Sequence, residues 1–107
     1  MKKKIFIIDG KNFSNIEGFY DEVQKKLTID FPGFGRNLDA FDDILYGGDE
    51  LFKFKEKIVI IWKNFNKSKK DLPSEFIKDV LEIIKHHKHI ELGGVKWFLL
   101  ITIIQII

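Results

Sequence analysis

The chain has no cysteine among its 107 residues, and this absence excludes three kinds of protein. Without cysteine there can be no disulfide-stapled scaffold, no thiolate metal site and no cysteine nucleophile. A chain of this composition suits a reducing compartment, and we expect a cytoplasmic protein.

Long apolar runs are absent too. The N-terminus carries three lysines and then only the apolar residues 5–8 before Asp9. An export signal needs about 7–15 apolar residues, so this segment predicts a strand. The most apolar stretch, residues 97–107, includes Thr102 and Gln105 and is much shorter than the roughly 20 residues of a membrane helix. We therefore expect no membrane partner.

The signatures of common enzymes are missing. Residues 33–35, Gly-Phe-Gly, lack the third glycine of a phosphate-binding loop and do not follow a strand. Neither Ser14 nor Ser68 lies in a G-x-S-x-G elbow, and neither has a histidine at a suitable distance. We predict a protein that is not an enzyme and that takes no small-molecule substrate.

Three histidines, His86, His87 and His89, form an H-H-x-H tract. A metal site is one interpretation, but neighbouring side chains diverge on a helix and the H-E-x-x-H zinc motif is absent. Histidines at the end of a helix also complement the negative end of its dipole, which explains them without a ligand. We expect no metal and no other cofactor.

The chain has enough apolar material for one core. Apolar residues make up 45% of it and include eleven phenylalanines, which predicts a single domain, residues 1–107. Residues 4–8 and 57–62 are short apolar runs typical of strands buried in a parallel sheet. We expect a third parallel strand within residues 95–104 of the apolar C-terminal segment 95–107, with residues 90–92 as the competing candidate.

Amphipathic helices are predicted between the strands. The first begins with a capping box of Ser14 and Glu17. The second begins at Asn37 and ends at the glycine pair 47–48, and the third opens at residues 73–74, Pro-Ser. Strands that alternate with helices predict a small α/β domain with a mainly parallel sheet. The apolar face of the first helix comprises Ile16, Phe19, Tyr20, Val23 and Leu27.

Acidic and basic residues are sorted into adjacent blocks, although the formal net charge is only +2. Residues 37–50 contain five acids and no base, whereas residues 51–70 contain seven lysines and one glutamate. The lysines from Lys63 to Lys70 could bind a phosphate backbone. This block has no arginine and only Phe65 among its lysines, which is more typical of a solvated face. We predict no nucleic-acid partner and keep an RNA-binding domain as an alternative.

The acidic block coincides with the second predicted helix. Asp39 and Asp43 are four residues apart and share one face, opposite the apolar Leu38 and Phe41. Like charges at this spacing destabilise a helix by about 0.2–0.5 kcal/mol, and Asp42 adds to the repulsion. The residues alone leave two interpretations open, an ordinary solvated face and a surface that presents anions to a partner.

Residues 34–45 read Phe-Gly-Arg-Asn-Leu-Asp-Ala-Phe-Asp-Asp-Ile-Leu. They resemble a motif of the barstar family of ribonuclease inhibitors, aromatic-Gly-x-Asn-[Leu/Trp]-Asp-Ala-[Leu/Phe]-x-Asp-x-Leu. The resemblance extends to residues 58–65 and 68–69 and to Val80 and Leu81, so that it covers roughly residues 5–89. It implies a three-stranded parallel sheet flanked by helices, and an inhibitor that enters the cationic active site of a small secreted ribonuclease.

The resemblance also implies roles for individual residues. Asp43 stands at the position of an aspartate that mimics a phosphate, and Asp39 at that of a second contacting aspartate. Asn37 matches an asparagine at the start of the interface, and His86 falls where a contacting glutamate stands on the last helix. The expected partner is therefore a ribonuclease.

The aromatic positions of the family pattern are not retained. Asp42 stands where the family has a tryptophan, just before the aspartate that aligns with Asp43. Gly48 stands where the family has a second tryptophan, after the helix, and Tyr46 where it has the threonine before that tryptophan. Gly33 replaces another aromatic residue, although Phe34 keeps the neighbouring ring. A module of this fold with a non-nuclease partner is therefore the other alternative. We expect the partner-binding residues to be Asp43, Asp39, Asn37, Phe34, Asp42, Tyr46 and His86.

Overall fold

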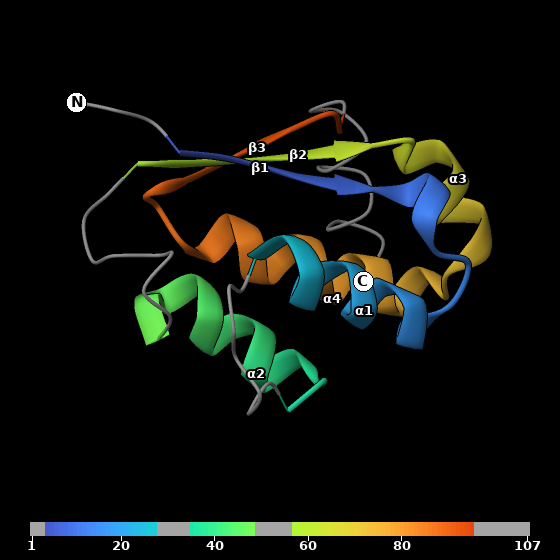
Figure 1. The fold of residues 1–107 in the computed structure, drawn as a ribbon, viewed down its shortest axis with the longest axis horizontal. Helices are drawn as coiled ribbons and strands as arrows, with labels where there is room; N and C mark the ends of the chain where they lie inside the picture. Colours follow the sequence, from blue (N-terminus) through green and yellow to red (C-terminus); the bar gives the residue numbers. More distant parts are fainter. Residues whose placement is uncertain (1–3, 28–34, 49–56, 96–107) are drawn as a thin grey trace.

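The computed structural model describes residues 4–27, 35–48 and 57–95 (Figure 1). Within these ranges no helix is long and apolar enough to cross a membrane. The elements are, in order, β1 (Lys4–Asp9), a 3-10 turn (Gly10–Asn12), α1 (Ile16–Leu27), α2 (Leu38–Asp43) with a π-helical continuation (Ile44–Gly48), β2 (Ile58–Lys63), α3 (Phe65–Asp71), α4 (Ser74–His86) and β3 (Ile90–Gly93).

The three strands form one parallel sheet in the order β1-β2-β3. Strand β1 pairs with β2 from Lys4 opposite Ile58 to Asp9 opposite Lys63. Strand β2 pairs with β3 from Ile58 opposite Ile90. The predicted α/β class, a small three-stranded parallel sheet flanked by helices, is confirmed, and so is the parallel pairing of the first two strands.

The third strand lies earlier in the chain than we expected. It is β3, residues 90–93, so the competing candidate at residues 90–92 is confirmed and residues 95–104 do not supply this strand. Helix α4 ends at His86, and the short turn after it returns the chain at once to β2, where Ile58 N donates to His89 O at 3.0 Å. The rest of the apolar C-terminal segment, residues 96–107, lies outside the described residues.

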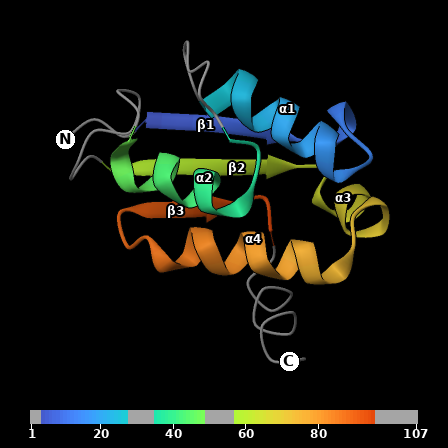
Figure 2. The same ribbon diagram turned by 90° about the horizontal axis from the view of Figure 1, so that it is seen from below.

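Helices α1, α2 and α4 lie on the same side of the sheet (Figures 1 and 2). The core between these helices and the sheet is aromatic. The ring of Phe19 stacks on Trp62 with centroids 5.6 Å apart, and it meets Phe41 edge-on at 5.7 Å. Such ring pairs stabilise the fold beyond their area burial. The predicted apolar face of α1 is buried, apart from the half-buried Ile16.

The start of α1 differs from the predicted capping box. Asn15, not Ser14, caps the helix, because its Oδ1 accepts from Gly18 N at 2.7 Å. The hydroxyl of Ser14 accepts instead from Lys67 Nζ at 3.2 Å. The side chain of Glu17 turns to Arg36 and does not return to the helix start. The side-chain amide of Asn15 therefore caps α1 in place of the hydroxyl of Ser14.

Helix α3 was not predicted, and it carries most of the block from Lys63 to Lys70. It is short, and it follows Asn64, which has a left-handed backbone (φ 57°) and makes no capping bond with its side chain. The helix is held by two buried residues on its inner face, Phe65 and Ser68. The hydroxyl of Ser68 accepts from Trp62 Nε1 at 3.0 Å, so α3 is fastened to β2.

Candidate functional site

Asn37 starts α2 as predicted. Its Oδ1 accepts from Ala40 N at 2.8 Å, and its Nδ2 donates to Gly35 O at 3.2 Å. The first of these bonds satisfies an N–H that has no partner within the helix. The side chain of Asn37 is thus committed to fixing where α2 begins, which in turn fixes the position of Asp39 in the first turn.

The apolar side of α2 and its continuation is buried against the rest of the domain. Phe41, Ile44 and Leu45 are at most 2% exposed, whereas Leu38 is half-buried. Because these side chains face inward, the helix period turns Asp39 and Asp43 outward, and both are exposed as predicted. Neither carboxylate is hydrogen-bonded or ion-paired to any of the other described residues.

Asp42 is the third acid of this surface, and its environment is different. We call Asp39, Asp42 and Asp43 together the acidic face. The carboxylate of Asp42 lies against α4, where Asp42 Oδ1 is 2.5 Å from Nε2 of His87. The side chain of His87 is only 5% exposed, whereas that of Asp42 is 49% exposed. Asp42 is therefore anchored on one side and open to solvent on the other.

The histidine that reaches the acidic face is His87 and not His86. His86 is the last residue of α4 and is exposed, with its ring 5.9 Å from that of His87. His87 follows as the residue at the C-cap and is buried, so the helix dipole alone does not explain its presence. The sequence offered no signal that distinguished the two, because they are adjacent and chemically identical.

Tyr46 lies in the π-helical continuation of α2 and is 68% exposed. Its ring meets the ring of His87 edge-on, with centroids 6.2 Å apart. Single π-helical turns occur frequently at functional sites. Asp42 and Tyr46 thus approach the same histidine from one side of α2, and an exposed aromatic ring borders the acidic face.

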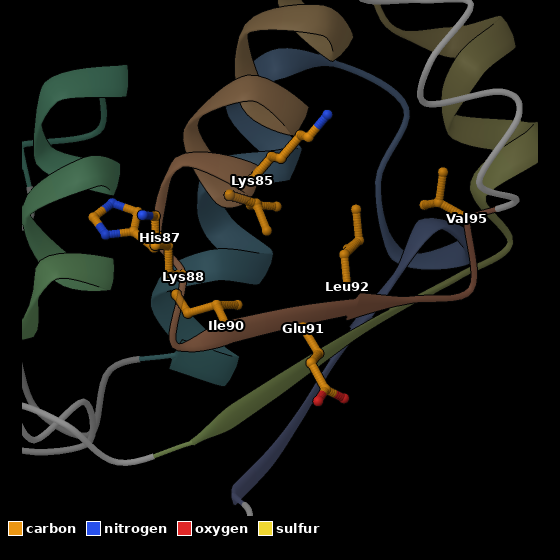
Figure 3. Close-up of a pocket in the computed structure, with 8 residues that line it drawn as sticks. Lys85, His87, Lys88, Ile90, Glu91, Leu92 and Val95 are labelled. Atoms are coloured by element: carbon orange, nitrogen blue, oxygen red, sulfur yellow. The ribbon is translucent and has the colours of Figure 1, made fainter.

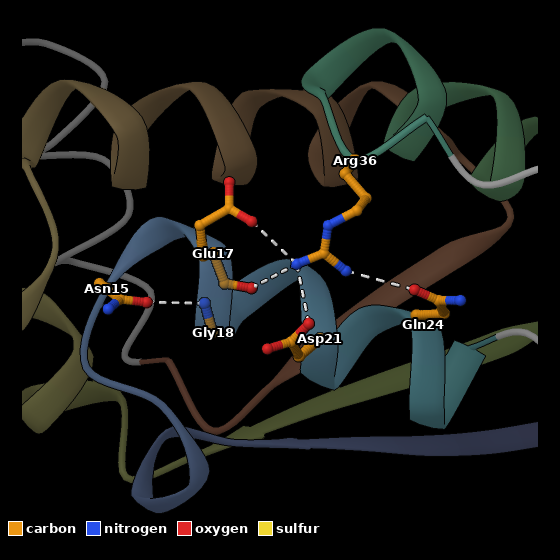
Figure 4. Close-up of polar contacts among 6 residues, drawn as sticks. All are labelled: Asn15, Glu17, Gly18, Asp21, Gln24 and Arg36. Atoms are coloured by element: carbon orange, nitrogen blue, oxygen red, sulfur yellow. Dashed lines mark hydrogen bonds and ion pairs between the residues drawn. The ribbon is translucent and has the colours of Figure 1, made fainter.

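Arg36 was not among the predicted site residues, yet it holds the segment before α2 against α1 (Figure 4). Its backbone is left-handed (φ 53°), and Nη2 donates to the carbonyl of Glu17 at 3.0 Å, to Glu17 Oε2 at 3.0 Å and to Asp21 Oδ1 at 2.8 Å. Nη1 donates to Gln24 Oε1 at 3.3 Å. The bonds to Glu17 and then Asp21 raise the pKa of the Arg36 guanidinium.

The contacts of Arg36 have an electrostatic consequence for α2. Arg36 precedes the acidic face in the sequence, but its guanidinium forms ion pairs with Glu17 and Asp21 of α1. The single arginine of the chain therefore does not neutralise the negative charge of Asp39 and Asp43. A signal for this role was hard to see, since Arg36 occupies the variable position of the motif.

A cavity of about 470 Å³ lies between the end of α4 and β3 (Figure 3). Its charged rim is mainly basic, so it does not extend the acidic face. His87 also borders it, which places this ring between the cavity and α2. Within the described ranges no three His, Asp or Glu side chains are grouped so as to hold a metal ion. The cavity is lined by Ile84, Lys85, His87, Lys88, Ile90, Glu91, Leu92 and Val95.

The structure thus brings some of the predicted site residues together on one surface. Asp39, Asp42, Asp43 and Tyr46 share the outer side of α2 and its continuation, while Asn37 caps the same helix. His86 ends α4 nearby, and Phe34 lies outside the described residues. A small parallel α/β domain that exposes an acidic, capped helix is suited to binding a cationic protein surface.

Comparisons with known proteins agree with this architecture. The family model described as "Barstar (barnase inhibitor)" matches residues 3–100. The chain belongs to this family. It is also 44% identical over 80 residues to the protein named "Putative ribonuclease inhibitor YrdF" of Bacillus subtilis (strain 168), an alignment that covers 74% of this chain and 79% of that protein.

Proposed function

We propose that this protein inhibits a small secreted ribonuclease by inserting the outer side of α2 into the cationic active site of that enzyme. The observation that carries the proposal is the exposure of Asp39 and Asp43 on one face of a capped helix whose opposite face is buried. Membership of the barstar family and the name of the curated relative support the same role.

The chemistry of the target explains why carboxylates would serve. A ribonuclease must direct Arg, Lys or His groups at a phosphodiester and at the charge that develops during its cleavage. The same groups form strong charge-assisted hydrogen bonds with carboxylates. A carboxylate held by the inhibitor occupies a phosphate position but offers no bond to cleave, so the enzyme is blocked without any reaction.

The residues take graded roles in this proposal. Asp43 supplies the main phosphate mimic, and Asp39 the second anion. Asn37 holds the start of α2, and Tyr46 adds an aromatic contact at the border of the acidic face. The remaining proposed contacts are Asp42, His86 and, on the sequence resemblance alone, Phe34.

The biological setting follows from the same proposal. A cell that makes a ribonuclease for export needs a partner that neutralises any enzyme still inside. We propose that the protein acts in the cytoplasm in this way, as a non-enzymatic immunity protein that requires no cofactor.

The test is coexpression with small nucleases encoded in the same genome. Each nuclease is expressed with and without this chain, and growth is scored. The proposal predicts that at least one toxic nuclease is neutralised, and that the two purified proteins form a complex that no longer cleaves RNA. A stable complex with a non-nuclease protein, or retention of RNA by the protein alone, would contradict it.

A further inference from the structure

The three acids of the acidic face are not equivalent in the free protein. Asp39 and Asp43 make no hydrogen bond to the described residues, so their carboxylates are free to rotate among rotamers. Asp42 has one oxygen, Oδ1, bound to His87 Nε2 at 2.5 Å, while half of its side chain stays exposed. Its orientation is therefore set before any partner arrives.

The anchor of Asp42 is itself fixed. His87 is buried, and its ring lies among those of His86, His89 and Tyr46, with centroids 5.9, 5.8 and 6.2 Å away. An ionised carboxylate can only accept a hydrogen bond, so Nε2 of His87 is the donor in this pair. A buried ring with a defined donor atom holds its acceptor in one direction.

We propose that His87 is a positioning residue, which fixes Asp42 so that its second oxygen, Oδ2, receives a cationic group of the partner. This inference rests on the proposed function and deepens it, because it makes Asp42 a determinant of specificity. The partner must then offer an arginine or lysine opposite this one carboxylate. An aromatic or acidic group there would leave Oδ2 of Asp42 buried without a partner.

The advantage of a fixed carboxylate is entropic. A side chain that is already held in its bound orientation loses less freedom on binding than a free one. The bond from His87 also leaves Asp42 partly compensated within the acidic face, where Asp39 and Asp43 stand three and one residues away. The hydrogen bond thus offsets part of the cost of placing a third acid in this helix.

The decisive experiment measures the dissociation constant of the complex with the nuclease found by coexpression. His87→Leu removes the donor, and Asp42→Asn removes the acceptor charge. We expect each to weaken binding by about tenfold or more, and the double variant to be no weaker than the worse single variant. Lys88→Ala, an exposed neighbour outside the pair, is the matched control and should bind like the parent.

Rescue by a conservative variant separates positioning from mere packing. His87→Gln keeps an N–H donor at a similar reach, whereas His87→Asn is too short to place it. Binding by the Gln variant should stay within about threefold of the parent and exceed that of the Asn variant. Equal binding by these two variants, or a folded His87→Leu that binds like the parent, overturns the inference. The Gln and Asn pair decides the matter even if His87→Leu does not fold.

A readout without the nuclease keeps the two proposals distinguishable. In the free protein, the Nε2 proton of His87 should give a slowly exchanging NMR signal that disappears in Asp42→Ala. Absence of this signal from the parent overturns the positioning role and leaves the proposed function standing. The opposite combination is also informative. If the signal is present but Asp43→Ala binds as tightly as the parent, His87 does position Asp42, and the acidic-face mechanism of inhibition is wrong.

Discussion

Helices α2 and α3 are similarly short and similarly rich in charge, but the arrangement of their charged side chains differs. In α2, Asp39 and Asp43 are exposed and engage none of the other described residues. In α3, Lys67 Nζ donates to Phe13 O at 2.8 Å and pairs with Asp71 at 2.6 Å. Lys69 and Lys70 of α3 are exposed as well, so a cluster of charge does not by itself identify a binding surface. What distinguishes α2 is that its two exposed acids share one face of a helix whose opposite face is buried.

The comparison is tested most strongly at Asp43. Replacing Asp43 by Ala should weaken inhibition by several kcal/mol, because charged groups paired across an interface typically cost about 2–5 kcal/mol when one partner is removed. The fold should be unharmed, since the change also relieves repulsion from Asp39. Titration of the nuclease with parent and variant, each verified as folded, measures the effect. Undiminished inhibition by Asp43→Ala would end the acidic-face mechanism.

The opposite result is expected at Ser68 in α3. Ser68→Ala leaves the indole N–H of the buried Trp62 without its acceptor, which should lower the free energy of unfolding by about 1–3 kcal/mol. Inhibition at a temperature where the variant is folded should match the parent. Urea denaturation and nuclease titration on the same sample give both values. A variant as stable as the parent would show that this bond does not fasten α3 to β2.

Asp39 should matter less than Asp43 but more than an ordinary surface residue. We expect Asp39→Ala to weaken inhibition by somewhat more than about 1 kcal/mol, the usual threshold for an interface residue that contributes energy. Asp39→Asn, which keeps the shape and loses the charge, is the matched variant. If Asn restores full inhibition, the contribution of Asp39 is not electrostatic.

Asp9 gives a smaller, pH-dependent effect. Its Oδ1 accepts from Lys11 N at 2.9 Å and from Asn64 Nδ2 at 2.8 Å, and these bonds lower the pKa of its carboxyl below the usual 3.8. The folded state thus gains stability from Asp9 above pH 3.8 and loses it as the pH falls through the lowered pKa. Asp9→Asn should flatten that part of the curve of unfolding free energy against pH. An unchanged curve would contradict this account.

The smallest effect is expected at Lys69, an exposed residue of α3. Lys69→Ala should leave inhibition and unfolding free energy within about 0.5 kcal/mol of the parent, as for most surface substitutions. It is the charge-changing control for Asp43→Ala. A loss of inhibition at Lys69 with none at Asp43 would reverse the comparison and favour RNA binding by α3.

Much of the fold could be predicted because its signals are local. Short apolar runs gave β1 and β2, and Asn37 followed by Leu38 and Phe41 gave the start and inner face of α2. Helix α3 was missed because its seven residues are too few for a clear period, and its helix start lacks a side-chain cap. The third strand was misplaced because apolar content favours residues 95–104, whereas the short turn after α4 puts residues 90–93 beside β2.

The buried Glu22 of α1 shows the same limit. By sequence it is a polar residue of α1, where solvent exposure is the usual expectation. In the structure it is 4% exposed, and its carboxylate accepts from Asp9 N at 2.8 Å and from Asn12 Nδ2 at 3.1 Å. These partners lie in β1 and the turn after it, so the contact exists only once α1 has packed there.

The sequence by itself determined which side of α2 faces outward, since helix period and apolar side chains decide that within one element. It could not determine that His87, and not His86, meets Asp42, or that Arg36 is tied to α1. Those contacts join residues 45 and 19 positions apart, and they depend on how one helix sits against another. These contacts are set only when α1, α2 and α4 pack on one sheet. A periodic pattern fixes the side of a helix on which a side chain lies, but not which residue of another helix that side chain contacts.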